Sequence, residues 1–188
     1  GTGADLGYTK IGNENLIMPG VMIAHDCVLG NNNILVDNSA LAGHVRLGDY
    51  VTLGGYTLVH QFCVLGSYSF TGMGSLISMD VPAFTRVAGN PIKQAGLNSI
   101  GLERKSFTKE QISNLKKAYK IFFREGLRSE DALEKMDLNK DIRESFGNDV
   151  IDSYLKLKRE EIKNFSREET FQKNKSITDW EKKNTLDC

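Results

Sequence analysis

Cysteine is scarce in this 188-residue chain, and neither sign of charge is in excess. The three cysteines are Cys27, Cys63 and Cys188. They are few and odd in number, which argues against a disulfide framework and indicates a reducing compartment. Their spacing excludes a local metal motif of the CxxC type. Basic and acidic residues are equal in number, 24 of each, which argues against a dedicated nucleic-acid-binding protein.

Long apolar runs are also absent. Hydrophobic residues make up 40% of the chain, yet no unbroken stretch is long enough to span a bilayer, and no secretory signal is visible at the start. We therefore expect a cytoplasmic protein without stable membrane insertion. The chain begins with Gly1 rather than methionine, which predicts a processed form or a fragment.

What the sequence does contain is a six-residue repeat. Every sixth residue from Ile11 is aliphatic, and the series breaks only at Thr71 before it resumes at Ile77. Its members are Ile11, Ile17, Ile23, Leu29, Leu35, Leu41, Leu47, Leu53, Val59 and Leu65. If about half of all residues count as apolar, such a run has a chance probability of about one in a thousand. A second series, of small or β-branched residues, falls four positions later: Cys27, Ser39, Val45, Val51, Thr57, Cys63, Ser69 and Ser75.

A period of six fits neither a helix nor an alternating strand, and it is typical of a parallel β-helix built from hexapeptides. Three short strands and tight turns form one triangular coil, and the aliphatic side chains stack inward at the strand spacing of about 4.8 Å. Glycine and asparagine, as in Gly12–Asn13 and Gly30–Asn31, supply the turn conformations. We predict about four coils over residues 11–82, in preference to ordinary antiparallel strands, which need no constant six-residue step.

The pattern becomes helical after Phe107. Thr108 and Gln111 form a capping box, apolar residues follow at three- and four-residue steps, and Gly126 ends this helix. We expect Ser129 to cap a second, short helix and residues 149–165 to form a third. The sequence thus predicts a mainly β chain with an α C-terminal part: a β-helix at 1–96, a small helical domain at 97–165 and a polar tail at 166–188.

All three histidines of the chain, His25, His44 and His60, lie in the repeats, at or near the predicted corners. A lone histidine is more often a surface residue, but three in consecutive coils indicate a functional site. His25 is followed by Asp26, and His60 by Gln61. Because adjacent residues of a strand point to opposite sides, we do not expect Asp26 to orient His25.

Five segments are informative in combination, because of their order and spacing: IAHDC, LAGHV, VHQFC, AGNP and GLERKSF. Together they resemble the UDP-N-acetylglucosamine 3-O-acyltransferases, which begin lipid A synthesis. The resemblance covers about residues 1–160, and these would be only the later coils and the helical domain of that family. It implies a left-handed β-helix and a homotrimer with active sites between neighbouring prisms.

The resemblance also implies a reaction, in which a 3-hydroxyacyl group passes from acyl carrier protein to the 3-hydroxyl of UDP-N-acetylglucosamine, with no cofactor or metal. His25 would be the general base that takes the proton of the sugar hydroxyl. Gly43, eighteen residues and one coil further on, would supply the backbone N–H that stabilises the oxyanion.

The resemblance assigns further residues to substrate binding: His44, His60 and Gln61 at the sugar nucleotide, Asn98 and Arg104 at its nucleotide end, and Met73 as the ruler of acyl length. Arg104 can meet a phosphate with its planar guanidinium. Met73 fills space that a glycine would leave open and so favours a shorter acyl chain. Two positions depart from the family: Met22 stands where many members have histidine, and Ile100 stands where a carboxylate is often found.

Three alternatives stay open at this point. One is the related UDP-3-O-acylglucosamine N-acyltransferase, which shares the repeats and a histidine base. Another is a γ-type carbonic anhydrase, in which three histidines would converge on one Zn²⁺ across a trimer interface. The last is a purely structural trimer without catalytic activity.

Overall fold

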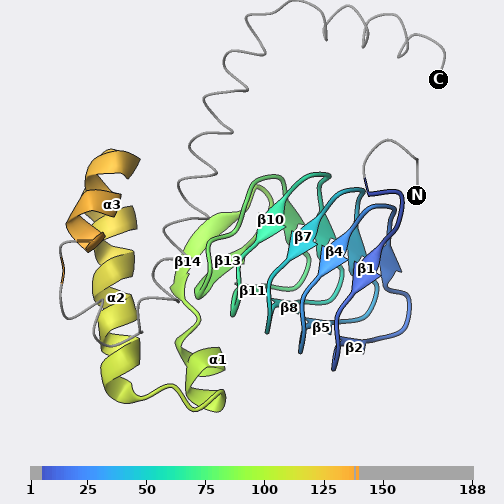
Figure 1. Cartoon of the computed structure of the whole chain (residues 1–188), viewed down its shortest axis with the longest axis horizontal. Helices are drawn as coiled ribbons and strands as arrows, with labels where there is room; N and C mark the ends of the chain where they lie inside the picture. Colours follow the sequence, from blue (N-terminus) through green and yellow to red (C-terminus); the bar gives the residue numbers. More distant parts are fainter. Residues whose placement is uncertain (1–5, 138, 140–188) are drawn as a thin grey trace, which may run out of the picture.

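A computed structural model of the chain describes residues 6–137 and 139. In this part the chain winds into a solenoid of short strands, and a hairpin and three helices follow at its C-terminal end (Figure 1). The solenoid strands are β1 (Lys10–Ile11), β2 (Leu16–Ile17), β3 (Met22–Ile23), β4 (Val28–Leu29), β5 (Ile34–Leu35), β6 (Ala40–Leu41), β7 (Arg46–Leu47), β8 (Thr52–Leu53), β9 (Leu58–Val59), β10 (Val64–Leu65), β11 (Phe70–Thr71) and β12 (Leu76–Ile77).

These strands form three parallel sheets, one on each side of a triangular prism. Their orders are β1-β4-β7-β10, β2-β5-β8-β11 and β3-β6-β9-β12, so each strand pairs with the third strand after it. Leu29 lies opposite Leu47, and Leu35 lies opposite Leu53, which is a register of 18 residues, or three hexapeptides. The predicted parallel β-helix of about four coils is therefore confirmed.

The prism interior consists of the two six-residue series. Leu29, Leu35, Leu41, Leu53 and Leu65 are at most 2% exposed, and the second series is buried at the corners: Cys27, Ser39, Val45, Val51, Thr57, Cys63, Ser69 and Ser75. Thr71, where the aliphatic series breaks, still points inward, because its hydroxyl bonds that of Thr57 at 3.0 Å. This hydrogen bond lets a polar residue occupy a core position at little cost.

The chain turns each corner through a residue in the left-handed backbone region. Positive φ recurs at six-residue intervals: Glu14, Gly20, Asp26, Asn32, Asn38, His44, Tyr50, Tyr56, Phe62, Tyr68 and Gly74. Aspartate and asparagine tolerate this conformation well, and aromatic residues do so rarely. Aromatic residues at these corners can stack on the corner residue of the next coil. The rings of Tyr50 and Tyr68, for example, are stacked with their centroids 4.8 Å apart. Stacking between coils offsets part of the backbone cost.

A hairpin that the sequence analysis did not anticipate continues one sheet. Strand β13 (Thr85–Ala88) pairs in parallel with β11, and β14 (Lys93–Leu97) returns antiparallel to β13. The alternation of buried Thr85 and Val87 with exposed Arg86 was the available signal. The hairpin covers the C-terminal side of the last coil.

Three helices follow: α1 (Ser99–Arg104), α2 (Lys109–Arg124) and α3 (Ser129–Asp137). The capping box of α2 is confirmed, because Thr108 Oγ1 accepts from the Gln111 N–H at 3.1 Å and Gln111 Oε1 accepts from the Thr108 N–H at 2.8 Å. The first hydrogen bond of α3 runs from Ala132 N–H to Arg128 O, so Arg128, rather than the predicted Ser129, precedes the helix. The expected helix at 149–165 and tail at 166–188 lie outside the described residues.

A second apolar cluster joins these helices to the solenoid. It contains Phe84, Leu102, Ile112, Leu115, Ala118, Ile121, Ala132 and Met136. The Phe84 ring is stacked on Tyr68 of the last coil at 5.5 Å and contacts Phe107 edge-on at 6.2 Å. Among the helices of the described part, none is both long and apolar enough to cross a bilayer.

Two cysteines belong to the prism interior. Burial raises the pKa of the Cys63 thiol to about 11, and the Asp80 carboxylate adds to the increase. Burial also raises the pKa of Cys27. Both thiols are free and buried, so they stay protonated and act as small apolar core residues.

We predict a loss of stability at alkaline pH that depends on Cys63. The pKa of the thiol is 9.0 in the unfolded chain and about 11 in the folded one, so the free energy of unfolding should fall as pH rises between these values. Urea denaturation of a Cys63→Val variant should show a smaller fall, since valine already occupies the equivalent positions 45 and 81. Equal falls in both proteins would contradict the assignment.

Candidate active site

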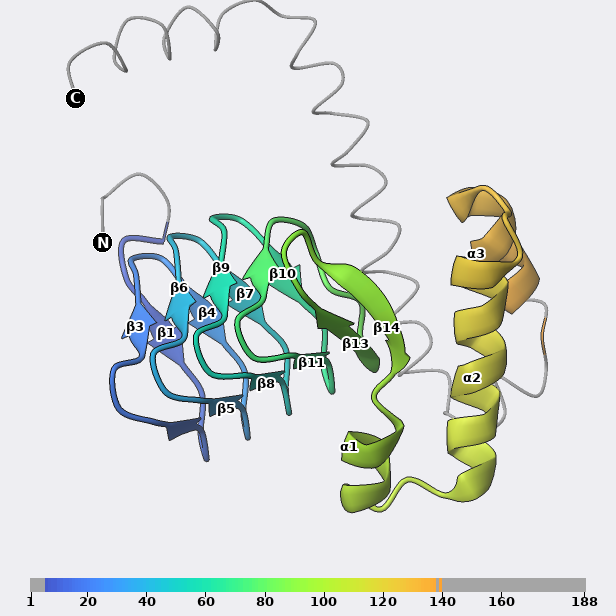
Figure 2. The same cartoon turned by 180° about the vertical axis from the view of Figure 1, so that it is seen from behind.

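All three histidines lie along one edge of the prism, where the sheet of β3, β6 and β9 meets that of β4, β7 and β10. Figure 2 shows these two sets of strands side by side. The corner segments that form this edge are residues 24–27, 42–45 and 60–63, one from each of three successive coils. The 18-residue register therefore stacks His25 on Gly43 and Gly43 on Gln61. It also stacks Asp26 on His44.

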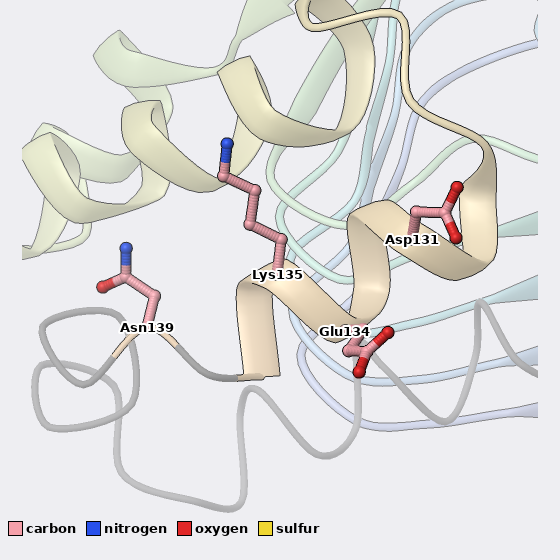
Figure 3. A pocket seen from close by; sticks show the side chains of 4 residues that line it. All are labelled: Asp131, Glu134, Lys135 and Asn139. Carbon is pink, nitrogen blue, oxygen red and sulfur yellow. The ribbon is translucent and has the colours of Figure 1, made fainter.

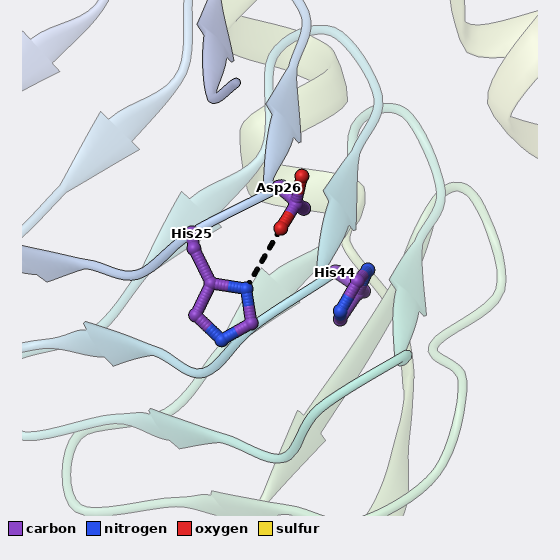
Figure 4. A group of neighbouring side chains, drawn as sticks. All are labelled: His25, Asp26 and His44. Atoms are coloured by element: carbon purple, nitrogen blue, oxygen red, sulfur yellow. Dashed lines mark hydrogen bonds and ion pairs between the residues drawn. The ribbon is translucent and has the colours of Figure 1, made fainter. Parts of the chain in front are cut away.

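His25 and Asp26 are hydrogen-bonded to each other, which corrects the expectation that Asp26 does not orient His25. His25 Nδ1 lies 2.9 Å from Asp26 Oδ2 (Figure 4). The expectation assumed an extended strand, but the pair occupies a corner, and Asp26 has a φ of 58°. This left-handed turn brings both side chains to the same side. The Asp26 carboxylate is fully buried, and its Oδ1 accepts a second hydrogen bond from the Gly7 N–H at 2.7 Å.

This geometry suits His25 to act as a base. When neutral, the imidazole donates its Nδ1 proton to the carboxylate, which leaves the lone pair on Nε2. The His25 side chain is 42% exposed, so a ligand can reach it. If Nε2 takes up a proton, the buried Asp26 carboxylate stabilises the resulting positive charge.

Gly43 lies directly against the His25 ring. A Cβ atom at position 43 would stand 2.5 Å from His25 Cε1 and 2.8 Å from Nε2, so any side chain there would displace the ring. The Gly43 carbonyl accepts a hydrogen bond from the Phe62 N–H at 3.1 Å. Within the described part of the chain, the Gly43 N–H has no acceptor, and it is available to an oxyanion beside His25.

Rings from the next coils continue the edge. His44 meets His25 edge-on with centroids 5.1 Å apart, and it is stacked on Phe62 at 4.6 Å. His60 Nδ1 lies 3.1 Å from the Gln61 carbonyl oxygen, and both side chains are exposed. Phe62 was missed by the sequence analysis, although its position, 18 residues after His44, was the signal for it.

Comparison with known proteins places the chain in a family. A family model described as "Udp N-acetylglucosamine O-acyltransferase; Domain 2" matches residues 80–173, which is half of the chain, and one described as "Bacterial transferase hexapeptide (six repeats)" matches residues 8–43. The chain belongs to the UDP-N-acetylglucosamine O-acyltransferase family. Its solenoid is the left-handed parallel β-helix of that family, as expected, and the assignment argues against the N-acyltransferase alternative.

Individual members of the family are similar over much of the chain. The acyl-[acyl-carrier-protein]–UDP-N-acetylglucosamine O-acyltransferase of Janthinobacterium sp. (strain Marseille) is 51% identical over 132 residues, which are 70% of this chain and 50% of the relative. That of Aliivibrio fischeri (strain MJ11) is 40% identical over 157 residues, 84% of this chain and 58% of the relative.

A crystal structure of the UDP-N-acetylglucosamine O-acyltransferase from Moraxella catarrhalis RH4 matches with a TM-score of 0.78 and 40% identity, over 85% of this chain and 60% of that one. The chain thus spans about half of the length of the curated relatives that it matches.

The other residues that the family resemblance assigned to the site lie apart from His25 in this chain. Met73 is at a different corner, after β11, and is 81% exposed, so it does not pack into the prism interior. Asn98 caps α1: its Oδ1 accepts from the Gly101 N–H at 3.3 Å, and its Nδ2 donates to the Tyr68 carbonyl at 2.9 Å. Arg104 is exposed at the end of α1.

The two departures from the family pattern also lie on the surface. Met22 on β3 is 59% exposed, and Ile100 on α1 is 61% exposed. Neither side chain therefore belongs to the core.

A pocket beside α3 lies away from the candidate site, and none of the residues discussed so far lines it. That pocket is lined by Asp131, Glu134, Lys135 and Asn139 (Figure 3). Lys135 is paired with Glu125 at 2.7 Å, and Asp131 is paired with Arg128 at 3.0 Å. These exposed ion pairs hold surface side chains in place, and the pocket contains none of the predicted site residues.

We predict that Gly43→Ala displaces the His25 ring. The hydrogen bond from His25 Nδ1 to Asp26 should be lost, and ¹⁵N NMR of the side chain should show a mixture of tautomers in place of the Nδ1-protonated form. Gly55→Ala is the matched control, because a Cβ there would stand 3.4 Å from its nearest neighbour, the Asp37 carbonyl oxygen. An unchanged His25 spectrum in a folded Gly43→Ala protein would refute the contact.

Proposed function

We propose that this chain transfers a 3-hydroxyacyl group from acyl carrier protein to the 3-hydroxyl of UDP-N-acetylglucosamine, the first step of lipid A synthesis. The relatives named above are acyl-[acyl-carrier-protein]–UDP-N-acetylglucosamine O-acyltransferases. The observation that supports the proposal most strongly is the His25 imidazole, which is oriented by buried Asp26 and lies against Gly43, whose N–H has no acceptor among the described residues.

In this reaction His25 Nε2 removes the proton of the sugar hydroxyl as its oxygen attacks the thioester carbonyl. General bases of this kind contribute about 10²–10⁴-fold in rate. Asp26 holds the ring and balances the charge of the imidazolium. The Gly43 N–H donates to the oxyanion of the tetrahedral intermediate, a contact worth about 2.7–4 kcal/mol. The oxyanion then collapses, the thiolate of the carrier protein leaves, and His25 returns the proton to it.

Substrate recognition is proposed for residues on both sides of the base. His44, His60 and Gln61 follow His25 along the same edge and would contact the sugar. Arg104 would pair with a phosphate of the nucleotide, since its guanidinium forms no ion pair within the described residues. Asn98 would act beside it, and its capping bonds would fix the start of α1 in the site.

We further propose that the enzyme is a cytoplasmic homotrimer. The outward positions of the sheet β3-β6-β9-β12 are all apolar, namely Met22, Ala40, Leu58 and Leu76, and Met22 and Leu58 are 59% and 48% exposed. By contrast, the outward positions of the sheet β1-β4-β7-β10 include Lys10 and Arg46. An exposed apolar face next to the histidine edge favours association with another chain there, which would convert the open edge into a cleft.

We predict that His25→Ala lowers acyl transfer by about 10²–10⁴-fold, while binding of UDP-N-acetylglucosamine changes little. Asp26→Asn should also lower the rate, because an amide cannot balance the charge of the imidazolium. Turnover would be measured with labelled UDP-N-acetylglucosamine and 3-hydroxyacyl carrier protein, and Ser113→Ala, on the exposed surface of α2, serves as the control.

The assay has two arms, because the chain spans about half of its curated relatives. One uses the chain itself, and the other a chimera in which the remaining coils come from the Janthinobacterium relative. Retention of most of the turnover in His25→Ala would exclude His25 as the base. A folded trimeric chimera that binds the nucleotide sugar without transferring acyl groups would favour the purely structural alternative.

We also predict that Met73 shortens the acyl chain that the enzyme prefers. An exposed methionine at the edge of a neighbouring prism would fill the far end of an acyl groove. Each methylene denied burial costs about 0.8 kcal/mol, so two lost methylenes change the preference by about tenfold. Met73→Gly should shift the length profile toward longer 3-hydroxyacyl carrier proteins, whereas Met73→Leu, which keeps the bulk, should not. Identical profiles for both variants would disprove this role.

A further inference from the structure

The base and its two neighbours also form a group of potential metal ligands. His25, Asp26 and His44 each offer one ligand atom, and these three atoms all lie within 4.8 Å of one another. They come from two successive coils, and Figure 4 shows the two rings and the carboxylate facing the same space. His60, the remaining histidine, is one coil further on and does not belong to the group.

The donor set suits Zn²⁺. Two imidazoles and a carboxylate are a common zinc-binding combination that leaves a fourth position open to water, with bonds of about 2.0–2.2 Å. Tetrahedral angles then place ligand atoms about 3.3–3.5 Å apart. The observed 2.9 Å between His25 Nδ1 and Asp26 Oδ2 needs to open by only a few tenths of an ångström. The His44 nitrogen already lies within 4.8 Å of the other two ligand atoms, so it needs only a limited movement to share an ion with them.

We propose that Zn²⁺ binds at this position, between His25 Nδ1, Asp26 and His44, and inhibits the protein. The metal takes the place of the proton that His25 shares with Asp26. A neutral imidazole coordinated through Nδ1 keeps its one proton on Nε2, so no proton is lost and the lone pair needed for base catalysis is no longer available. The negative charge of Asp26, buried and adjacent to the ion, makes the site more attractive to a cation than two exposed histidines would be.

The surroundings also support a defined site. His44 is held from the far side by its stack on Phe62. The absence of a side chain at Gly43 leaves the His25 ring free to approach the backbone. The Phe62 stack therefore limits the positions open to the His44 ring, and Gly43 leaves the His25 ring room to adjust to an ion.

The test is calorimetric titration of the whole chain with Zn²⁺ alone, in a Cys188→Ser background that removes the cysteine outside the described residues. We expect one ion per chain. His25→Gln and His44→Gln should each weaken binding at least about tenfold, and Asp26→Asn by about 10–100-fold. His60→Gln is the matched control and should bind as the parent does. Circular dichroism would establish that each variant is folded.

Equal affinity of the His25→Gln, His44→Gln and His60→Gln proteins would overturn the proposal, as would the absence of binding to the folded parent. The titration contains no substrate, so its outcome is independent of the acyl-transfer proposal. In an active preparation, inhibition by Zn²⁺ that is reversed by a chelator should accompany binding, and full activity of the Zn²⁺-loaded protein would contradict the inhibitory role.

Discussion

The parallel pairing of residues 18 positions apart is the constraint on which the rest of the structure depends. Backbone N–H groups of one coil donate to carbonyls of the neighbouring coils, as in the bonds from Val28 to Val45 and from Gly30 to Leu47. A residue therefore always meets its equivalent one coil later, at the spacing of paired strands. The same pairing stacks leucine on leucine inside the prism and His25 on Gly43 at its edge, so the core and the candidate site have one geometric origin.

Much of the solenoid could be predicted because the pattern and the pairing have the same period. The six-residue series locates strands, interior and corners without knowledge of any long-range contact, and Leu29, Leu41 and Leu53 are buried as expected. The capping box of α2 was equally accessible, since its hydrogen bonds join residues only three apart. The hairpin β13–β14 lacks the six-residue repeat, and the short alternation at Thr85, Arg86 and Val87 does not by itself show which strand it pairs with.

For the candidate site, the periodicity brings His25, Gly43, His44, His60 and Gln61 onto one edge, where the resemblance required them. The direction of the Asp26 side chain could not be read from alternation, because it depends on a left-handed turn at that residue. For Asn98 the structural role was the part that was missed. Its sequence context suggested a ligand contact, but its side-chain amide also caps α1 and bonds the Tyr68 carbonyl. Contacts that need a second chain, as proposed for Met73, lie beyond what one chain's pattern can specify.

The close approach of His25 to Gly43 has a consequence for how such a protein can change in evolution. Removing one hexapeptide between them would leave every aliphatic residue in phase and the prism interior filled. The residue beneath His25 would then be Asp49 instead of Gly43. The Asp49 side chain would then occupy the place of the His25 ring. Its backbone now belongs to a different corner of the prism, the one between β7 and β8. An insertion or deletion of one or two hexapeptides in this region can thus preserve the fold and still destroy the site. Only a change by a whole coil of 18 residues preserves the register between His25 and the residue stacked on it.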